Sequence, residues 1–294
     1  MADISVIIVT FNSDKFIKHC LDYFAGQSNR GLEVIIIDNG STDDTVKLIS
    51  RDYPDVVLIK NNDNIGPAKA RNQGIEIARG EWVLTLDCDT VPEKNFLVNF
   101  DKIKENLAPD IGIIQPKILQ YDKRTIYSTG IFLSWLRRFY DIGRGEIDNG
   151  QFEEQKFVFA ACSAAAFYRR NMLDRIKEKS VFFDENFFFL VEDIDLAWRA
   201  RNRGYKTLYY PKAVCYHRGN SSGVNKKFRQ YLSLRNKYLL LQKNDEIKGL
   251  KKISLFLLYD LPRILYLLFT NSYIFKGLNE LDIFYRKVTR MRNE

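Results

Sequence analysis

The chain has 294 residues, of which 46% are hydrophobic and 28% charged, so it can bury a sizeable core and is not a disordered protein. Its formal net charge of +8 favours anionic partners such as nucleotides, phosphorylated sugars, nucleic acid or an anionic membrane face. Four cysteines without a CxxC pair argue against a zinc ribbon or a disulfide framework and fit a reducing compartment. No basic and apolar leader follows Met1, so we expect no signal peptide.

The first part of the chain alternates apolar strand patterns with helical patterns. Strands are predicted over residues 4–10, 33–37, 56–60 and 82–86, and helices over 14–24, from an N-cap at Ser41 to Ile49, and over 68–78. This alternation predicts βαβ units, right-handed crossovers and a mainly parallel sheet.

Three of these strands end in polar residues. Thr10-Phe11-Asn12 follows the first strand, Asp38-Asn39 the second and Asp87-Cys88-Asp89 the fourth. Since the carboxyl ends of parallel strands share one edge, these tips are expected to converge on one ligand. The two carboxylates of the last tip are costly to bury unless a cation or a polyhydroxyl ligand satisfies them, and an Asp-rich turn is the alternative. A GxGxxG fingerprint and a P-loop are both missing, which argues against a dinucleotide site or a P-loop NTPase.

The pattern is looser after residue 91. We predict a helix over 96–107, strands over 111–119, 126–132, 157–168, 205–211 and 214–217, and a loop or flap over 135–150.

A second acidic cluster, Glu192-Asp193, follows the apolar run 187–191 and begins a predicted helix. The helix dipole lowers carboxylate pKa values at this position, so simple capping is one interpretation. In a semi-buried cleft, such a carboxylate can instead accept a proton from an alcohol. Within the helix, Asp195 and Arg199 are spaced to pair. His217 ends a predicted strand and is a candidate metal ligand, with a structural role as the alternative.

In their order, these segments resemble a family 2 glycosyltransferase of the GT-A fold, nearest to the bacterial rhamnosyltransferase-like branch. The resemblance covers about residues 4–236 and rests on segments 6–12 with 38–43, 64–74, 87–89, and 192–199 with Pro211 and His217. It implies an α/β fold of GT-A type with a mainly parallel central sheet flanked by helices. The catalytic domain would span residues 1–240, with a Rossmann-like nucleotide half (1–90) and an acceptor half (91–240). A helical extension (241–294) would follow it.

The resemblance also implies a set of donor-binding residues. Thr10 and Phe11 would flank the nucleotide base, with Asn12 beside them, and Asp38 would accept a hydrogen bond from the imide of uracil or thymine. Arg71 would approach the base or the phosphates. Phe11 departs from the family pattern, in which tyrosine is frequent, so stacking is kept but a hydroxyl is lost.

The acidic clusters acquire separate roles in this comparison. Asp87 would contact the donor, and Asp87, Asp89 and His217 would hold Mg²⁺ or Mn²⁺ on its diphosphate. Asp193 would be the general base, with Glu192 beside it as a support or a substrate contact. One base and no carboxylate nucleophile imply inversion at the anomeric carbon.

The C-terminal segments carry basic residues among aliphatic ones. Arg235 can reach a phosphate of donor or acceptor, or form a surface salt bridge. Over residues 248–275 we find no uninterrupted apolar run near the ~20 residues that span a bilayer, so we expect the segment to lie on an anionic membrane surface. A helical hairpin packed on the catalytic domain and a homodimer interface are the alternatives.

The sequence therefore predicts an inverting, metal-dependent glycosyltransferase at the inner face of the cell membrane, with no nucleic-acid partner. It would move a sugar from a UDP- or dTDP-sugar, dTDP-rhamnose among them, to a glycan or polyprenyl-linked saccharide in cell-surface polysaccharide synthesis. A sugar-1-phosphate nucleotidyltransferase is an alternative, although the glycine-rich loop that it needs after the first strand is missing. A membrane-bound scaffold with a degenerate site is another.

Overall fold

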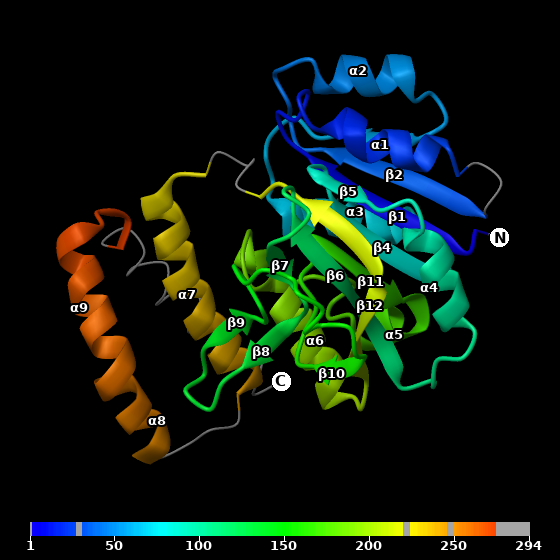
Figure 1. The fold of residues 1–294 in the computed structure, drawn as a ribbon. Helices are drawn as coiled ribbons and strands as arrows, with labels where there is room; N and C mark the ends of the chain where they lie inside the picture. Colours follow the sequence, from blue (N-terminus) through cyan, green and yellow to red (C-terminus); the bar gives the residue numbers. More distant parts are fainter. Residues whose placement is uncertain (1, 28–30, 220–223, 246–249, 275–294) are drawn as a thin grey trace.

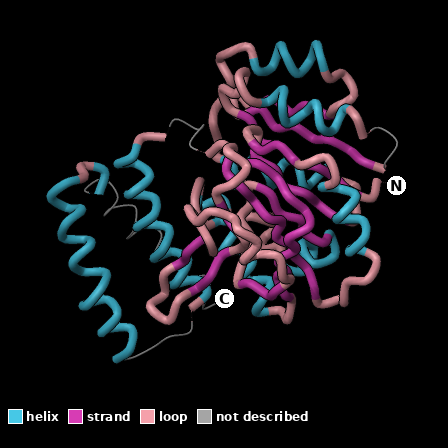
Figure 2. Tube along the Cα trace, viewed as in Figure 1, coloured by secondary structure: helices cyan, strands magenta, loops and turns pink. Residues whose placement is uncertain are grey.

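The computed structural model describes residues 2–27, 31–219, 224–245 and 250–274 (Figure 1). In this part of the chain, one large sheet lies between two layers of helices, and a helical arm packs beside this body. Figure 2 shows that the strands are confined to the body and that the arm is helical.

The large sheet has the strand order β10-β12-β6-β11-β4-β1-β2-β3, with β5 paired to β12 and β7 to β6. Its first four strands in the chain pair in parallel, as do β6 and β12, whereas β11 is antiparallel to β4 and β6. A small hairpin, β8–β9, forms a second sheet. The strands are β1 Ile4–Thr10, β2 Leu32–Asp38, β3 Val57–Lys60, β4 Trp82–Asp87, β5 Thr90–Pro92, β6 Ile111–Gln120, β7 Ile126–Ser128, β8 Ile131–Leu133, β9 Phe139–Asp141, β10 Lys156–Val158, β11 Ala165–Arg169 and β12 Lys206–His217.

The helices cover both faces of the sheet because successive strand residues point to opposite sides. On one face, Val6 and Ile8 pack with helices α1, α2 and α4; on the other, Ile7 packs with α3, α5 and α6. The helices of the body are α1 Ile17–Ala25, α2 Thr45–Asp52, α3 Pro67–Ile77, α4 Phe96–Lys104, α5 Arg170–Ile176, the 3₁₀ turn η1 Glu185–Phe187 and α6 Glu192–Asn202. This arrangement confirms the predicted α/β class with a mainly parallel, helix-flanked sheet.

Several local predictions were wrong. The segment 135–150, predicted as a loop or flap, contains strand β9, and the strands predicted over 205–211 and 214–217 are one strand, β12. Residues 126–132 form two strands, β7 and β8, because Gly130 turns the chain with a φ of +118°. The strand predicted over 157–168 is broken between β10 and β11, where residues 159–164 leave the ladder. Ser41 does not cap α2, which begins at Thr45; its hydroxyl instead donates to Asp38 at 2.5 Å.

The arm consists of α7 (Lys226–Asn244) and a continuous helical stretch of α8 (Leu250–Leu255), the π-helical turn η2 (Phe256–Asp260) and α9 (Leu261–Thr270). The predicted boundary at residue 240 falls inside α7, and the division into domains stays a prediction. Residues 246–249 and 275–294 of the predicted extension lie outside the described residues.

The described part of the arm holds one helix, Ile253–Thr270, that is long and apolar enough to cross a membrane by length and composition alone. Its mean hydropathy is 1.5, and 11% of it is buried. Asp260 and Arg263 interrupt this helix, so it is not the uninterrupted apolar run that we looked for in the sequence, but it meets the length and hydropathy of a membrane span with both charges included.

Candidate active site

Predicted strand tips meet at one edge of the sheet. In the parallel register, Thr10 pairs with Asp38 and Val9 pairs with Asp87. A cavity opens at this edge, and its lining includes six of the predicted site residues: Thr10, Phe11, Arg71, Asp87, Asp89 and His217. The three strand tips therefore converge on one cavity, to which the second tip contributes Asn39.

Three of these residues form a candidate metal site. One ligand atom from each of Asp87, Asp89 and His217 lies within 4.8 Å of the others. The Nε2 atom of His217 is 3.1 Å from Asp89 Oδ1 and 3.7 Å from Asp87 Oδ2. The pairing of β5 with β12 sets this contact, because His217 lies opposite Thr90, the residue after Asp89.

The chemistry of this trio fits a divalent cation. Two carboxylates and an imidazole are a mixed oxygen and nitrogen donor set, which suits Mn²⁺ and also Mg²⁺. Asp89 and His217 are almost fully buried, and burial of two nearby carboxylates is costly without a compensating positive charge. Burial disfavours the charged imidazole, but the hydrogen bond to Asp89 and the charges of Asp89 and Asp87 outweigh it and raise the pKa of His217. Since a metal must displace this proton, cation binding is expected to weaken in acid.

Arg71, on α3, connects this trio to the second acidic cluster. Its Nη2 donates to Asp87 Oδ1 at 3.1 Å, and its Nη1 donates to Glu192 Oε1 at 2.6 Å. Both Arg71 and Glu192 are about 5% exposed. The guanidinium therefore compensates one carboxylate of each cluster, and Glu192 is held in an ion pair beside the cavity.

Asp193, the next residue, is hydrogen-bonded by two backbone amides. Its Oδ2 accepts a hydrogen bond from the Ser163 amide at 3.1 Å, and its Oδ1 accepts one from the Ile194 amide at 2.8 Å. Burial and the neighbouring charge of Glu192 raise the pKa of Asp193 to about 7. At neutral pH, a carboxyl group with such a pKa is deprotonated in a large fraction of molecules and is a stronger base than an ordinary aspartate, so it is suited to accept a proton.

The segment that precedes α6, and so positions Glu192 and Asp193, has positive φ values at three non-glycine residues. Phe188, Leu190 and Val191 have φ values of 60°, 72° and 65°. Such conformations cost about 1–3 kcal/mol each and are most unusual for a β-branched residue such as Val191. Strain of this kind is often concentrated at functional sites, where surrounding contacts hold it in place.

On α6, the predicted pair of Asp195 and Arg199 is confirmed at 2.8 Å, and it is buried. Arg199 also donates to the backbone carbonyls of Ile176 and Phe182. This pair fixes α6 to the protein body and does not face the cavity lining.

Three residues predicted to bind the donor are instead hydrogen-bonded to other parts of the protein and are not in the described cavity lining. Asp38 is buried and accepts from the hydroxyl and the amide of Ser41, and it is not part of the described cavity lining. Asn12 accepts from the Thr42 amide at 2.8 Å and so joins two loops at the rim. Arg235 lies under the loop that precedes α6 and donates to backbone carbonyls at 2.9 and 3.1 Å. Their roles in donor binding stay predictions.

The structure adds residues that we did not single out. The Tyr127 ring packs edge-on against His217, with ring centroids 4.3 Å apart, and Arg144 lies 4.2 Å above the Tyr127 ring. Asn39 and Asn64 also line the cavity and are hydrogen-bonded to each other at 3.3 Å. Tyr127 and Arg144 come from a region that we interpreted as strand and flap, and no motif marks them in the sequence.

The fold is that of known GT-A glycosyltransferases. Residues 1–349 of TarS from Staphylococcus aureus share 20% identity and a TM-score of 0.55, over 85% of this chain and 68% of that one. The mannosyltransferase PcManGT from Pyrobaculum calidifontis, in complex with GDP-Man and Mn²⁺, shares 18% identity and a TM-score of 0.57, over 84% and 65%. GalNAc-T7 with UDP, GalNAc and Mn²⁺ shares 15% identity and a TM-score of 0.62, over 83% and 48%.

Residues 5–177 match the model of glycosyl transferase family 2, so the chain belongs to this family. Glycosyltransferase GlyG of Streptococcus pneumoniae is 27% identical over 41% of this chain and 40% of its own length. Poly-β-1,6-N-acetyl-D-glucosamine synthase of Staphylococcus aureus is 24% identical over 72% of this chain and 49% of its own. The chain thus spans less than half the length of these relatives.

Proposed function

We propose that the chain is an inverting, metal-dependent glycosyltransferase that moves a sugar from a nucleotide diphosphate donor to a hydroxyl group in cell-surface polysaccharide synthesis. One observation carries the proposal: Arg71 bridges Asp87 of the Asp87-Asp89-His217 trio to Glu192, the residue directly before the Asp193 carboxylate. The similarity to poly-β-1,6-N-acetyl-D-glucosamine synthase supports the polysaccharide context.

The trio would hold the cation, which when bound neutralises the diphosphate leaving group. Arg71 remains beside it as a fixed positive charge. We place the nucleoside at the strand tips that carry Thr10, Phe11, Asn12 and Asp38. The structures of TarS with UDP and with UDP-GlcNAc support a uridine donor, and a thymidine donor such as dTDP-rhamnose meets the same imide chemistry.

Asp193 would take the proton of the acceptor hydroxyl as that hydroxyl attacks the anomeric carbon. Glu192 is less suited to this role, because its buried ion pair with Arg71 stabilises the charged carboxylate. With one base and no carboxylate nucleophile, a single displacement inverts the anomeric configuration.

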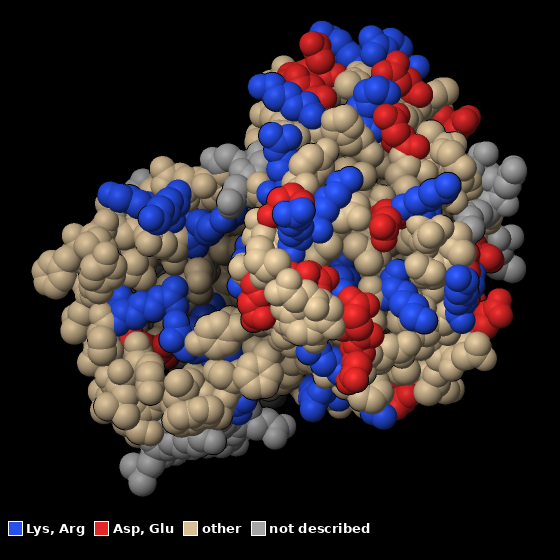
Figure 3. Space-filling view, in the orientation of Figure 1, with Lys and Arg blue, Asp and Glu red and all other residues tan. Residues whose placement is uncertain are grey.

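We further propose that the arm rests on the cytoplasmic face of the cell membrane and brings the site to a lipid-linked saccharide. Its apolar side chains are unusually exposed, with Leu258 at 70%, Tyr266 at 64% and Phe269 at 90%. Figure 3 shows the lobe that holds α7 and α9 as mostly uncharged, with blue basic clusters and little red, which suits anionic lipid. The pair of Lys237 with Asp260 ties the middle of this helical stretch to α7 at 2.5 Å, and so favours a position in the plane of the membrane over a crossing.

The proposal is tested by a thermal-shift screen of nucleotide diphosphates and nucleotide sugars with Mn²⁺, followed by a transfer assay with the best donor. Metal-dependent stabilisation by UDP or dTDP and release of the nucleoside diphosphate on transfer support it. Release of pyrophosphate from a nucleoside triphosphate and a sugar 1-phosphate would instead identify a nucleotidyltransferase. The absence of any metal-dependent nucleotide binding would indicate a degenerate scaffold.

A further inference from the structure

Helix α7 carries a buried amide that bonds the loop before the proposed base. We call residues 184–191 the catalytic loop. The Nδ2 atom of Asn236 lies 2.8–2.9 Å from the carbonyl oxygens of Phe187, Phe189 and Leu190, and Asn236 is fully buried. Its Oδ1 accepts from Arg235 Nε at 2.9 Å, so the amide is fixed in this orientation.

The carbonyls that Asn236 bonds belong to the strained part of the chain. Phe188, Leu190 and Val191 all have positive φ, and the chain would relax from this conformation without outside contacts. Glu192 and Asp193 follow directly. A change in the loop therefore moves the start of α6 and with it the Asp193 carboxylate.

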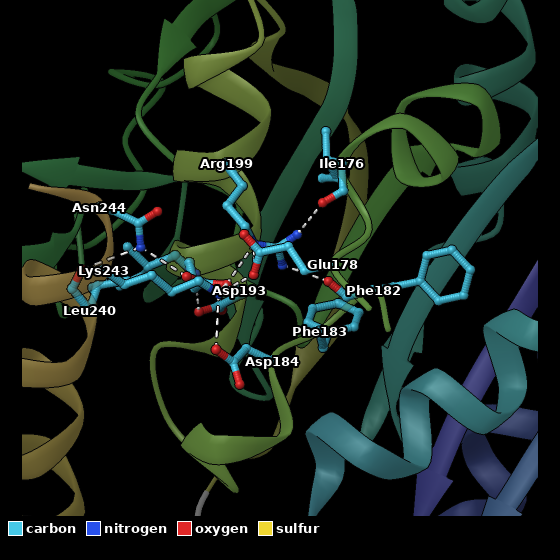
Figure 4. Close-up of polar contacts among 12 residues, drawn as sticks. Ile176, Glu178, Phe182, Phe183, Asp184, Asp193, Arg199, Leu240, Lys243 and Asn244 are labelled. Atoms are coloured by element: carbon cyan, nitrogen blue, oxygen red, sulfur yellow. Dashed lines mark hydrogen bonds and ion pairs between the residues drawn. The ribbon is translucent and has the colours of Figure 1, made fainter. Parts of the chain in front are cut away.

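The last turn of α7 holds the same region from its other side (Figure 4). Lys243 Nζ lies 2.9 Å from Asp184, at the start of the catalytic loop, and 3.1 Å from Asp195, which follows it on α6. Asn244 donates to the other oxygen of Asp195 at 2.8 Å. Helix α7 thus bonds the loop at its start, along its strained middle and just beyond its end.

We propose that Asn236 is a positioning residue for the proposed reaction: it holds the catalytic loop in its strained conformation and thereby sets the place of Asp193. This inference rests on the proposed role of Asp193 as the base. Asn236 does not line the described cavity, so it acts through the loop and contacts neither donor nor metal. Arg235 supports it by bonding the carbonyls of Asn186 and Phe187.

The test compares Asn236→Ala with Asn236→Asp, which keeps the shape but removes the donor atoms, and with Asn236→Ser, which keeps one donor. The control is Asn271→Ala, because Asn271 is equally buried and donates to the Lys227 carbonyl but has no described bond to the catalytic loop. Full-length proteins are compared by the kcat for UDP release from UDP-GlcNAc with Mn²⁺, by UDP–Mn²⁺ affinity and by backbone hydrogen exchange over residues 187–195.

We expect kcat to fall by about 100-fold in Asn236→Ala and Asn236→Asp, since a shift of about 1 Å in a reacting group has this effect. The UDP–Mn²⁺ affinity should fall much less than kcat, because the metal ligands lie on β4, the turn after it and β12, and the catalytic loop contributes only Phe188 and Phe189 to the described cavity lining. Asn236→Ser should be intermediate, and hydrogen exchange should quicken in the catalytic loop but not in α3.

The inference is overturned if folded Asn236→Ala keeps its kcat and its loop protection, or if Asn271→Ala loses as much turnover. Should the alanine variant not fold, the serine variant and its local exchange decide the question in the same way. If the unsubstituted chain binds no nucleotide and transfers nothing, the proposed function fails; loop exchange that quickens in the Asn236 variants would still show that the amide holds the loop.

Discussion

Replacing Asp193 with Asn is expected to abolish most transfer while making the protein more stable. The substitution keeps the shape of the side chain and one oxygen for the Ser163 amide, but it removes the proton acceptor and the second oxygen, which accepts from the Ile194 amide; this lost bond offsets part of the gain in stability. A positioned base contributes about 10²–10⁴-fold to rate, so kcat should fall by a factor in this range.

The stability gain follows from the pKa of the carboxyl. A pKa of about 7, against 3.8 for an ordinary aspartate, means that the charged form costs about 4 kcal/mol in the folded state at high pH. Because the Asp193 side chain keeps partial contact with solvent, we expect a smaller gain of about 1–3 kcal/mol for Asp193→Asn above pH 7. The gain should shrink as the pH falls and vanish below about pH 4, where aspartate is neutral in both states.

The assay combines urea unfolding of both proteins at pH 8 and pH 4 with nucleotide release at saturating donor and Mn²⁺. In the unsubstituted chain, kcat should rise with pH through about 7 as Asp193 loses its proton. A variant that transfers at a near wild-type rate, or that is less stable at pH 8, would refute the reasoning.

Three further predictions test other parts of the site and the arm. His217→Ala should weaken Mn²⁺ binding in calorimetry. In the unsubstituted chain, the Mn²⁺ affinity should fall in acid, because the pKa of His217 is raised and a proton competes with Mn²⁺ for its imidazole; an Mn²⁺ affinity independent of pH would contradict this. Arg71→Met should lower kcat and unfolding stability together, by about 3–5 kcal/mol in stability, because Glu192 is left buried and unpaired; unchanged melting would contradict the role of the bridge. The double variant Phe269→Asp and Leu258→Asp should no longer float with anionic liposomes but should keep its glycosyl transfer in solution, and Lys47→Ala, at an exposed position outside the arm, is the control. Unchanged flotation would contradict membrane binding by the arm, and a concentration-dependent dimer that the variant loses would favour a second copy as the partner of the exposed face of the arm.

Much of the body could be predicted because its signals are local. The buried β1 and β2 strands, the helix that begins near Glu192 and the pair of Asp195 with Arg199 each follow from short patterns in the sequence. The metal trio was reached through the resemblance together with the strand-end positions of its residues, and the parallel register supplies the physical reason for their meeting.

What escaped prediction depends on contacts between distant segments. Arg71 bridges Asp87 and Glu192, which are separated by more than a hundred residues, and no local pattern shows that a helix places its guanidinium between them. Asn236 looks like an ordinary polar residue of an amphipathic helix, and only the folded chain shows that it bonds three carbonyls of a strained loop. The segment between β10 and β11 likewise makes contacts with distant residues, since Ala160 pairs with Ile131 and the Ser163 amide bonds Asp193.

The central claim is that one cation site holds the donor while a separate carboxylate performs the proton chemistry. Calorimetry of UDP binding with and without Mn²⁺ tests it most directly in the unsubstituted chain, Asp89→Asn and Asp193→Asn. We predict Mn²⁺-dependent UDP binding that is lost in Asp89→Asn and kept in Asp193→Asn. Binding that is equal in all three proteins, or that does not depend on Mn²⁺, would contradict the account.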